Sequence, residues 1–486
     1  MADFRPDARR PRGLQDRRGR DLAAERAIVE RVLGVYEAWG FERLETSAFE
    51  YADALGKFLP DQDRPNEGVF ALEDDDGQWL ALRYDLTAPL ARFVAENFDA
   101  LPKPYRRCAA GPVWRNEKPG PGRYREFWQC DADTVGSASP AADAEMIAMA
   151  CAALEAAGVK RGGYAIKINT RRLLNGVLDA IGVGAEDRAT RLGVLRAVDK
   201  LDRLGVAGVR QLLGAGRKDD SGDFTKGAGL SAEAAERVLA FVGAGRATRA
   251  ETLAALAPVV GGSVDGEAGL RELGDIVAVL DALGVADAQA AVDPTIVRGL
   301  EYYTGAVFEA QLLGAGEGAA DTSFGSVGGG GRYDDLVSRF RGQPIPATGF
   351  SVGVSRLAAA LAAQLGEADA GPVVVLVLDQ AEVADSFALA DMLRKDGIAA
   401  EVYLGSSGMK AQMKYADRRN APVAVIVGGD ERARGAVSLK NLRAGAELAA
   451  RAADREAWTK GREDVQIEVP RADMVAAVRR MMSGTD

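Results

Sequence analysis

Apolar and polar positions follow two spacings along this chain, that of helices and that of strands. Between residues 22 and 39, apolar pairs recur at helical spacing and Gly40 follows, which predicts an amphipathic helix. A second helical pattern covers 141–157 and ends at Gly158. Between these two helices, short runs predict strands at 79–84, 105–109, 111–115 and 126–133.

The pattern changes at about residue 171, where Ala, Leu, Arg and Glu dominate and glycines separate short helical patterns. This helical block continues to residue 290, and strand-like sequence resumes at 295–298 and 306–312. The block therefore interrupts a sheet domain rather than following it. We predict a discontinuous first domain, 1–170 and 291–365, with a helical insertion at 171–290.

A polar, breaker-rich segment at 366–372 follows a predicted helix at 355–365 and predicts a domain boundary. Near-continuous apolar strands separated by helices indicate a small α/β domain with a buried sheet at 372–486. The alternating strands and helices are expected at 373–378, 382–395, 398–404, 410–420 and 423–427. The fold class is therefore α/β, with an α+β first domain.

Composition places the chain among ordinary globular proteins. It has 486 residues, of which 47% are hydrophobic and 27% charged, enough for two to four domains. No stretch approaches the roughly 18 to 20 apolar residues of a membrane helix, and the first residues have no apolar signal core. We expect a cytoplasmic protein without a membrane segment. Cys108, Cys130 and Cys151 lack a CxxC spacing, so we expect buried thiols rather than disulfides or a zinc site.

The net charge is −10, which is unusual for a nucleic-acid binder. Two basic clusters nevertheless stand out, the arginines of 9–20 and the lysines and arginines of 410–419. They predict local basic patches on an acidic body. Solvated faces and a frayed N-terminus explain either cluster equally well when it is taken alone.

Three segments carry arginines in a chain that contains no histidine: Arg115-Asn-Glu117, Arg298-Gly-Leu-Glu-Tyr-Tyr-Thr-Gly305 and Gly353-Val-Ser-Arg356. A guanidinium is always charged and binds phosphate or carboxylate oxygens in a bidentate manner. Without imidazole, the chain has no Ser-His-Asp triad, HExxH zinc site or histidine general base. The arginines therefore predict a site that holds phosphate, where the substrate supplies much of the chemistry.

Three other motifs allow two interpretations each. Asp85 and Thr87 follow a predicted strand, where they can hold an amino group or cap the next helix. The glycines of 328–331 can let a ligand approach the backbone, or form a flexible turn. Tyr302 and Tyr303 can line a polar pocket or pack in a sheet, and packing is the better interpretation of the pair in isolation.

The order of these motifs resembles class II aminoacyl-tRNA synthetases, and closely the histidyl-tRNA synthetase family. The resemblance covers nearly the whole chain, and the Arg298-Gly-Leu-Glu-Tyr-Tyr303 segment is diagnostic of the histidine-specific branch. The C-terminal segments 414–417, 423–428 and 437–442 look like the anticodon-binding domain of that family. The resemblance implies an antiparallel sheet flanked by helices. The other motifs that carry it are 83–87, 122–129, 329–334 and 349–356.

The resemblance implies a two-step reaction. Histidine attacks the α-phosphate of ATP and releases pyrophosphate, and the adenylate then passes histidine to the 3′ end of tRNA(His). It implies that Arg115 and Arg298 contact the α-phosphate and the substrate carboxylate, and that Mg²⁺ accompanies ATP. Arg356 is expected to hold the γ-phosphate and cover one face of adenine, with Phe127 on the other face and Glu117 at the adenine edge. A homodimer is also expected.

The resemblance also assigns a histidine pocket. Asp85, Thr87 and Gln129 are expected around the ammonium group. Asp133 and Tyr303 are expected against the imidazole, and Tyr302 and Arg298 are grouped with this pocket.

Three positions depart from the usual family pattern. Trp128 stands where histidine is usual, and strand alternation predicts that it faces away from Phe127 and Gln129. Ser47 stands where the dimer-forming motif commonly has proline, and the 118–122 loop differs from the commoner bacterial wording.

Two rival functions belong to different classes. A regulatory paralogue in histidine biosynthesis typically lacks the C-terminal domain and the catalytic arginine segment, and both are present here. A non-catalytic sensor of uncharged tRNA would tolerate loss of the three arginines, which are retained. A chain free of histidine could be translated when its own product is scarce, and chance is the alternative explanation.

Overall fold

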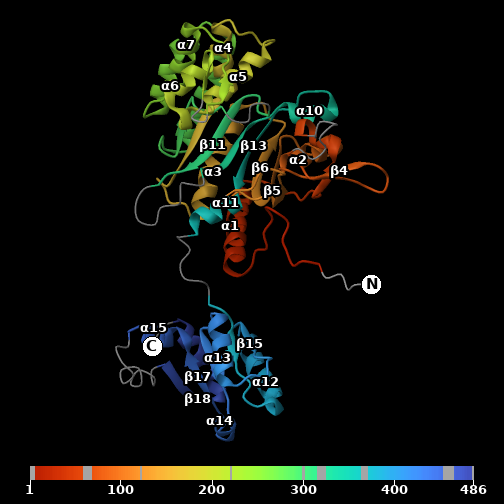
Figure 1. Cartoon of the computed structure of the whole chain (residues 1–486), viewed down its shortest axis with the longest axis vertical. Helices are drawn as coiled ribbons and strands as arrows, with labels where there is room; N and C mark the ends of the chain where they lie inside the picture. The colour runs from red at the N-terminus through yellow and green to blue at the C-terminus, as the bar shows by residue number, and fades with distance from the viewer. Residues whose placement is uncertain are drawn as a thin grey trace. The chain divides into compact units, whose positions relative to one another are not determined.

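A computed structural model describes residues 6–58, 68–120, 123–218, 222–297, 302–314, 325–362, 370–451 and 465–483. The chain forms two units, Met1–Leu365 and Gly366–Asp486, which Figure 1 shows in red to green and in blue. The helices predicted as an insertion lie within the first unit. The α/β class, with a sheet that is largely antiparallel and flanked by helices, is confirmed.

An eight-stranded sheet forms the centre of the first unit. Its neighbouring strands are antiparallel except at the two edges, where β1 pairs with β5 and β7 with β10 in parallel. In sheet order the strands are β1 (Glu42–Arg43), β5 (Tyr105–Trp114), β6 (Glu126–Val135), β13 (Ala347–Gly353), β12 (Ser326–Arg332), β11 (Ala306–Leu312), β7 (Tyr164–Thr170) and β10 (Ala290–Val292).

Two strand predictions need correction. The separate strands expected at 105–109 and 111–115 are the single strand β5, because Gly111 continues the ladder opposite Gln129. The side chain of Arg83 occupies the space that a Cβ of Gly111 would need. The strand expected at 295–298 is not formed in its described part: the backbone N–H of Thr295 bonds to the Asp293 carboxylate at 2.9 Å, which makes a turn.

The glycine run 328–331 is strand rather than turn. It forms most of β12, between β11 and β13. A Cβ on Gly330 would clash with the carbonyl of Gly349 and with the ring of Phe308, so only glycine lets the three strands approach this closely. The run therefore gives part of the sheet a bare backbone surface.

Three helices cover one face of the large sheet and form the main core. They are α1 (Gly19–Ala38), α3 (Pro140–Ala157) and α11 (Val354–Leu361). Apolar side chains of α1 such as Ile28 and Val32 are fully buried against α3 and the sheet, which explains the helical spacing in the sequence. Gly158 ends α3 in the left-handed conformation, as predicted.

The second face carries smaller elements. A three-stranded antiparallel sheet has the order β2 (Phe49–Tyr51), β4 (Trp79–Leu82), β3 (Ala71–Glu73), and the 3₁₀ segment η1 (Ala52–Phe58) packs on it. Helix α2 (Thr87–Glu96) contacts α10 (Asp335–Arg341), and Figure 1 shows both near β4. Thr87 was expected to cap α2, but it is the first residue of the helix, and Asp85 accepts the backbone bonds instead.

The predicted helical block is confirmed as helical and gathers at one end of the first unit (Figure 1). Glu272 joins it to the large sheet, since its carboxylate accepts bonds from the Ala306 N–H and the Thr170 hydroxyl, both at 3.0 Å. The elements are α4 (Arg171–Ala180), α5 (Arg188–Val198), α6 (Leu201–Leu213), β8 (Gly216–Lys218), β9 (Phe224–Lys226), α7 (Ala232–Val242), α8 (Arg249–Val260) and α9 (Val264–Ala282).

The second unit has a five-stranded sheet whose first three strands are parallel, as the continuous apolar runs predicted. The sheet order is β15 (Ala400–Val402), β14 (Val373–Val375), β16 (Val423–Ile426), β17 (Ala436–Asn441) and β18 (Gln466–Pro470). The helices are α12 (Val383–Lys395), α13 (Met409–Arg418), α14 (Gly429–Ala433), α15 (Leu442–Arg451) and α17 (Met474–Ser483).

Two compositional predictions can also be compared with the fold. Cys108, Cys130 and Cys151 are free and buried, as expected. Among the helices that the structure describes, none is long and apolar enough to cross a bilayer.

Candidate functional site

The cavity in which the predicted residues meet lies in the first unit and has a volume of about 560 Å³. Its walls come from the β4–α2 turn, strands β5, β6 and β11 to β13, and the start of α11. The expected nucleotide residues that line it are Arg115, Glu117, Phe127 and Arg356, and the expected histidine residues are Asp85, Thr87, Gln129, Tyr302 and Tyr303. Arg298 lies outside the described residues, and Asp133 is not part of the wall.

One part of the cavity is cationic. Arg115 donates from Nε to the Tyr84 carbonyl at 3.2 Å, which places its guanidinium carbon 5.2 Å from the centre of the Phe127 ring. Arg356 donates to the Ser326 carbonyl at 2.6 Å, and Arg123 also lines the wall. These arginines face a flat aromatic ring, which suits a ligand with a planar base and anionic oxygens.

The N-terminal arm supports this cationic part from behind. Arg17 contacts the carboxylate of Glu25 and lies 3.1 Å from that of Glu126. Glu25 also accepts from the hydroxyl of Ser355 at 2.8 Å. Since Glu126 precedes Phe127 and Ser355 precedes Arg356, one buried network links the backbones that carry two wall residues.

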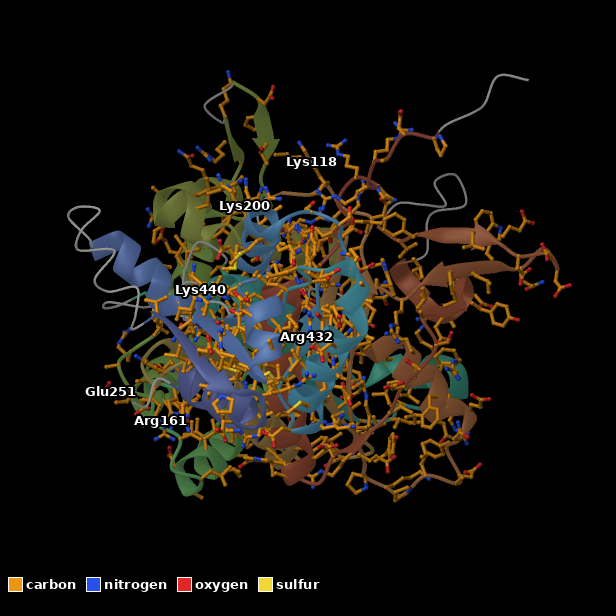
Figure 2. All side chains as sticks on the ribbon, turned by 90° about the horizontal axis from the view of Figure 1, so that it is seen from below. Lys118, Arg161, Lys200, Glu251, Arg432 and Lys440 are labelled. Carbon is orange, nitrogen blue, oxygen red and sulfur yellow. The ribbon has the colours of Figure 1, made fainter. Side chains whose placement is uncertain are left out.

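The loop between β5 and β6 borders the same part of the cavity. Lys118, labelled in Figure 2, is exposed on this loop, and Glu117 beside it lines the wall. The Arg125 N–H bonds to the carbonyl of Gly13 at 2.8 Å, so the N-terminal arm also touches the end of the loop.

The opposite part of the cavity is anionic and phenolic. One carboxylate oxygen of Asp85 accepts from the backbone N–H groups of Thr87 and Ala88, at 3.0 and 2.8 Å. Burial raises the pKa of Asp85, although these two backbone donors oppose the rise. Tyr302 and Tyr303 pack edge to face at 5.2 Å, and burial raises the pKa of both phenols, so they act as neutral hydrogen-bonding groups.

Strand β6 presents three polar side chains on the cavity face, because Gln129, Asp131 and Asp133 alternate with apolar residues. Gln129 donates from Nε2 to the Ser351 hydroxyl at 2.8 Å. Asp131 lies opposite Ser351 in the ladder and lines the cavity. Burial raises its pKa to about 7, although the Arg107 guanidinium and the Ser351 hydroxyl favour ionisation.

Asp133 is held one step deeper in the wall. Its carboxylate lies 2.9 Å from the Arg107 guanidinium and accepts a hydrogen bond from the Tyr333 hydroxyl. Burial raises the pKa of Asp133, and the opposing effect of Arg107 is larger than that of Tyr333. The structure therefore brings Asp131, rather than the expected Asp133, to the cavity surface.

Sequence reasoning missed Asp131, Ser351, Glu309 and Arg123, which all line the cavity. A signal existed for Asp131, because it lies two positions from Gln129 and a strand repeats its face every second residue. No comparable local signal marked Glu309, which comes to the cavity from β11 through the pairing of three other strands.

The residues fit a metal ion only as part of a ligand complex. In the described parts of the chain, no group of three or more His, Cys, Asp and Glu side chains is close enough to hold an ion alone. Mg²⁺ usually binds through one or two carboxylates together with phosphate oxygens and water. Glu309, which is 4% exposed and lines the cavity, provides one such carboxylate.

The unusual residues at 128 and 47 lie apart from the cavity wall. Trp128 points away from Phe127 and Gln129, as alternation predicted, and the Arg26 guanidinium covers its ring at 3.8 Å. Ser47 accepts from the Phe49 N–H at 3.3 Å, near the start of β2.

Comparisons with known proteins agree with this geometry. The family model for histidyl-tRNA synthetase matches residues 13–357, and that for an anticodon binding domain matches residues 372–480. A histidine–tRNA ligase of Caulobacter vibrioides is 64% identical over 488 residues, covering 99% of this chain and 98% of its own. One from Cereibacter sphaeroides is 56% identical over 493 residues, covering 99% of each.

Solved structures are similar over most of the chain. A histidyl-tRNA synthetase from Nostoc has a TM-score of 0.74 at 26% identity and covers 98% of this chain and 100% of its own. A Bacillus halodurans protein named as an ATP phosphoribosyltransferase regulatory subunit/histidyl-tRNA synthetase has a TM-score of 0.66 at 25% identity. It covers 85% of this chain and 97% of its own.

Proposed function

Because this chain belongs to the histidyl-tRNA synthetase family, we propose that its cavity activates histidine with ATP and then transfers it to the 3′ end of tRNA(His). The observation that carries the proposal is the division of one cavity into a cationic and an anionic part. The protein is thus an ATP-dependent histidine–tRNA ligase. The match to both the synthetase and the anticodon-binding regions favours this over the regulatory paralogue and the tRNA sensor.

The cationic part is suited to ATP. Adenine would lie on Phe127, with Glu117 at its edge and Arg356 over its other face and at the γ-phosphate. Arg115 would meet the α-phosphate, with Arg298 assigned beside it by the family motif. Attack by an anionic carboxylate on an anionic phosphate needs positive charge on both groups, which arginines provide without any proton transfer.

The second step also suits a site without imidazole. The hydroxyl of the terminal ribose of tRNA would attack the carbonyl of the adenylate, and AMP would leave with the bonding electrons of the broken mixed anhydride. The proton of the hydroxyl would pass to a phosphate oxygen of the departing AMP. No histidine base exists in this chain, so the substrate supplies the proton acceptor.

The anionic part is suited to histidine. Asp85, Thr87 and Gln129 would surround the ammonium group, and the phenols of Tyr302 and Tyr303 would meet the imidazole. The Tyr302 hydroxyl is buried and has no partner among the residues that the structure describes. A substrate without ring nitrogens would leave such groups unpaired, which would exclude phenylalanine. Asp133 would reach the imidazole only after Tyr333 gives up its hydrogen bond.

Magnesium is proposed as the companion of ATP. The Glu309 carboxylate would hold it together with phosphate oxygens. When bound, the ion would screen the charge of the phosphates. Every other charge contact in the cationic part comes from arginines of this chain.

The second unit is proposed to contact the anticodon of tRNA. Lys410, Lys414 and Arg418 are exposed on α13, whereas Arg419 is paired with Glu401 at 2.9 Å. Lysines and arginines on one helix suit a phosphate backbone. Since charging of tRNA takes place with the translation machinery, we also expect a cytoplasmic protein.

A homodimer and class II architecture are part of the proposal. One face of the small sheet carries Phe49, Tyr51 and Leu72, which are 42%, 55% and 46% exposed, while the opposite face packs on η1 and α2. An apolar sheet face of this kind suits an interface, and a second copy of this chain is the proposed occupant.

The test is histidine-dependent exchange of labelled pyrophosphate into ATP by the full chain. Arg115→Ala should abolish exchange, whereas Arg43→Ala, at an exposed ion pair with Glu37, should leave it unchanged. The other amino acids should give no exchange. If the folded wild-type protein gave no exchange while it bound tRNA or another protein, the regulatory or sensor function would replace this proposal.

A further inference from the structure

Two buried acceptor atoms on β6 face the cavity without a protein donor. Gln129 is 7% exposed and Asp131 is 2% exposed. Gln129 Oε1 and Asp131 Oδ1 have no hydrogen-bond partner in the described part of the chain. Leaving a buried acceptor unpaired costs about 1–3 kcal/mol, and more when the group is charged. Two such atoms, two residues apart on one strand face, therefore indicate a ligand group that donates to both.

Ser351 on the neighbouring strand sets the orientation of both acceptors. It accepts from Gln129 Nε2 at 2.8 Å, so the amide nitrogen is used and the amide oxygen is left for the cavity. Ser351 also lies directly opposite Asp131 in the β6–β13 ladder, and its hydroxyl stabilises the carboxylate form of Asp131.

The neighbouring carboxylates are already engaged within the protein. Asp85 accepts two backbone N–H groups at the start of α2. Asp133 takes the Arg107 guanidinium and the Tyr333 hydroxyl. Asp131 is therefore the carboxylate of this group that keeps an oxygen open to the cavity. A ligand group that matches one anionic and one neutral acceptor is a cation with several N–H bonds.

A metal ion is a poorer match for these atoms. The other acidic wall residue, Glu309, comes from β11, which is three strands away from β6 in the sheet. At about 4.8 Å per strand this separation is about 14 Å, too far for the two carboxylates to share one ion. An amide oxygen and one carboxylate are also fewer ligands than Mg²⁺ needs without phosphates.

We propose that Asp131 is a substrate-binding carboxylate that supplies the counter-charge for the α-ammonium of the amino acid, with Gln129 Oε1 as the second acceptor. This assignment rests on the proposed function of the cavity. The imidazole is left to the phenols of Tyr302 and Tyr303, so Asp131 contributes to affinity without distinguishing the side chain.

The test uses three ligands and two variants of the full chain, by calorimetry without ATP or magnesium. L-histidine and L-histidinol carry the ammonium, whereas 3-(imidazol-4-yl)propionate keeps the imidazole and lacks it. Asp131→Asn should weaken the first two by about 10- to 100-fold, the range for a charge-assisted hydrogen bond. It should leave the third unchanged, which also shows that the variant pocket is folded. Asp133→Asn is the comparison, and it should not discriminate by the ammonium group.

A second readout uses the absence of histidine from this chain. With ¹⁵N-labelled L-histidine, the ligand provides the sole imidazole signals of the complex. These signals should have the same shifts in wild-type protein and in Asp131→Asn. If they move, or if propionate binding falls as much as histidine binding, Asp131 serves the imidazole or the fold, and the proposal is overturned.

Failure of the inference and failure of the proposed function can be told apart. If wild-type protein binds histidine and exchanges pyrophosphate but Asp131→Asn binds all three ligands normally, the role of Asp131 alone is wrong. If the wild-type protein binds none of the three ligands and shows no exchange, the function proposed for the cavity is wrong, and this inference falls with it.

Discussion

Asp131→Asn should stabilise the ligand-free protein as the pH rises, even though it weakens substrate binding. Burial raises the pKa of Asp131 from 3.8 to about 7 in the folded state. Burial outweighs the attraction of Arg107 on β5, while Asp133 and, more weakly, Asp85 repel the charge and Ser351 favours it. Asparagine resembles the protonated carboxyl in shape and cannot ionise.

The magnitude follows from proton linkage. Between pH 3.8 and about 7 the folded protein keeps a proton that the unfolded chain has lost, so unfolding releases it and stability falls as pH rises. The full stability of this group is present below pH 3.8, and the loss is complete above about 7. At about 1.4 kcal/mol per pH unit, the wild-type protein loses about 3 kcal/mol between pH 5 and pH 8, and the variant loses none of it.

Denaturant unfolding followed by tryptophan fluorescence measures this difference. Four of the five tryptophans, at 39, 79, 114 and 128, belong to the first unit, so the signal follows mainly the unit that contains Asp131. The advantage of Asp131→Asn should grow by about 3 kcal/mol from pH 5 to pH 8. Asp99→Asn, at an exposed carboxylate, should show no such growth. An advantage that is constant or shrinks with pH would refute the reasoning.

Three further perturbations test other parts of the structure. Arg17→Ala should raise the KM for ATP several-fold with little change in that for histidine, because it loosens the network behind Phe127 and Arg356, and equal changes in both would contradict this. Gly330→Ala should cost at least about 2 kcal/mol of stability through its clash with the next strand, whereas Gly274→Ala on α9, with open space around it, should gain up to about 1 kcal/mol in thermal or denaturant unfolding. Leu72→Glu should shift sedimentation from dimer to monomer, and an unchanged dimer would assign another surface to the interface.

The sequence by itself determined the elements whose pattern is local. The helical spacing of residues 22–39 and the glycine at 158 depend on neighbours within a turn or two, and the structure has α1 and α3 there. Strand alternation likewise separated Trp128 from Phe127 and Gln129, since successive side chains point to opposite faces. The motifs of the family added the set of arginines and carboxylates, because they record a chemistry that spacing alone does not encode.

Only the tertiary structure decided what depends on partners far away in the chain. Glycines 328–331 became a strand because the strands on either side leave no room for a Cβ, which a local pattern cannot reveal. The same holds for the two aspartates of β6, which share one face and one local pattern. Arg107 on the next strand pairs with Asp133 and Ser351 lies opposite Asp131, so strand register leaves one carboxylate sealed and the other open to the cavity. Alternation selects the face, but register between distant segments selects the partner.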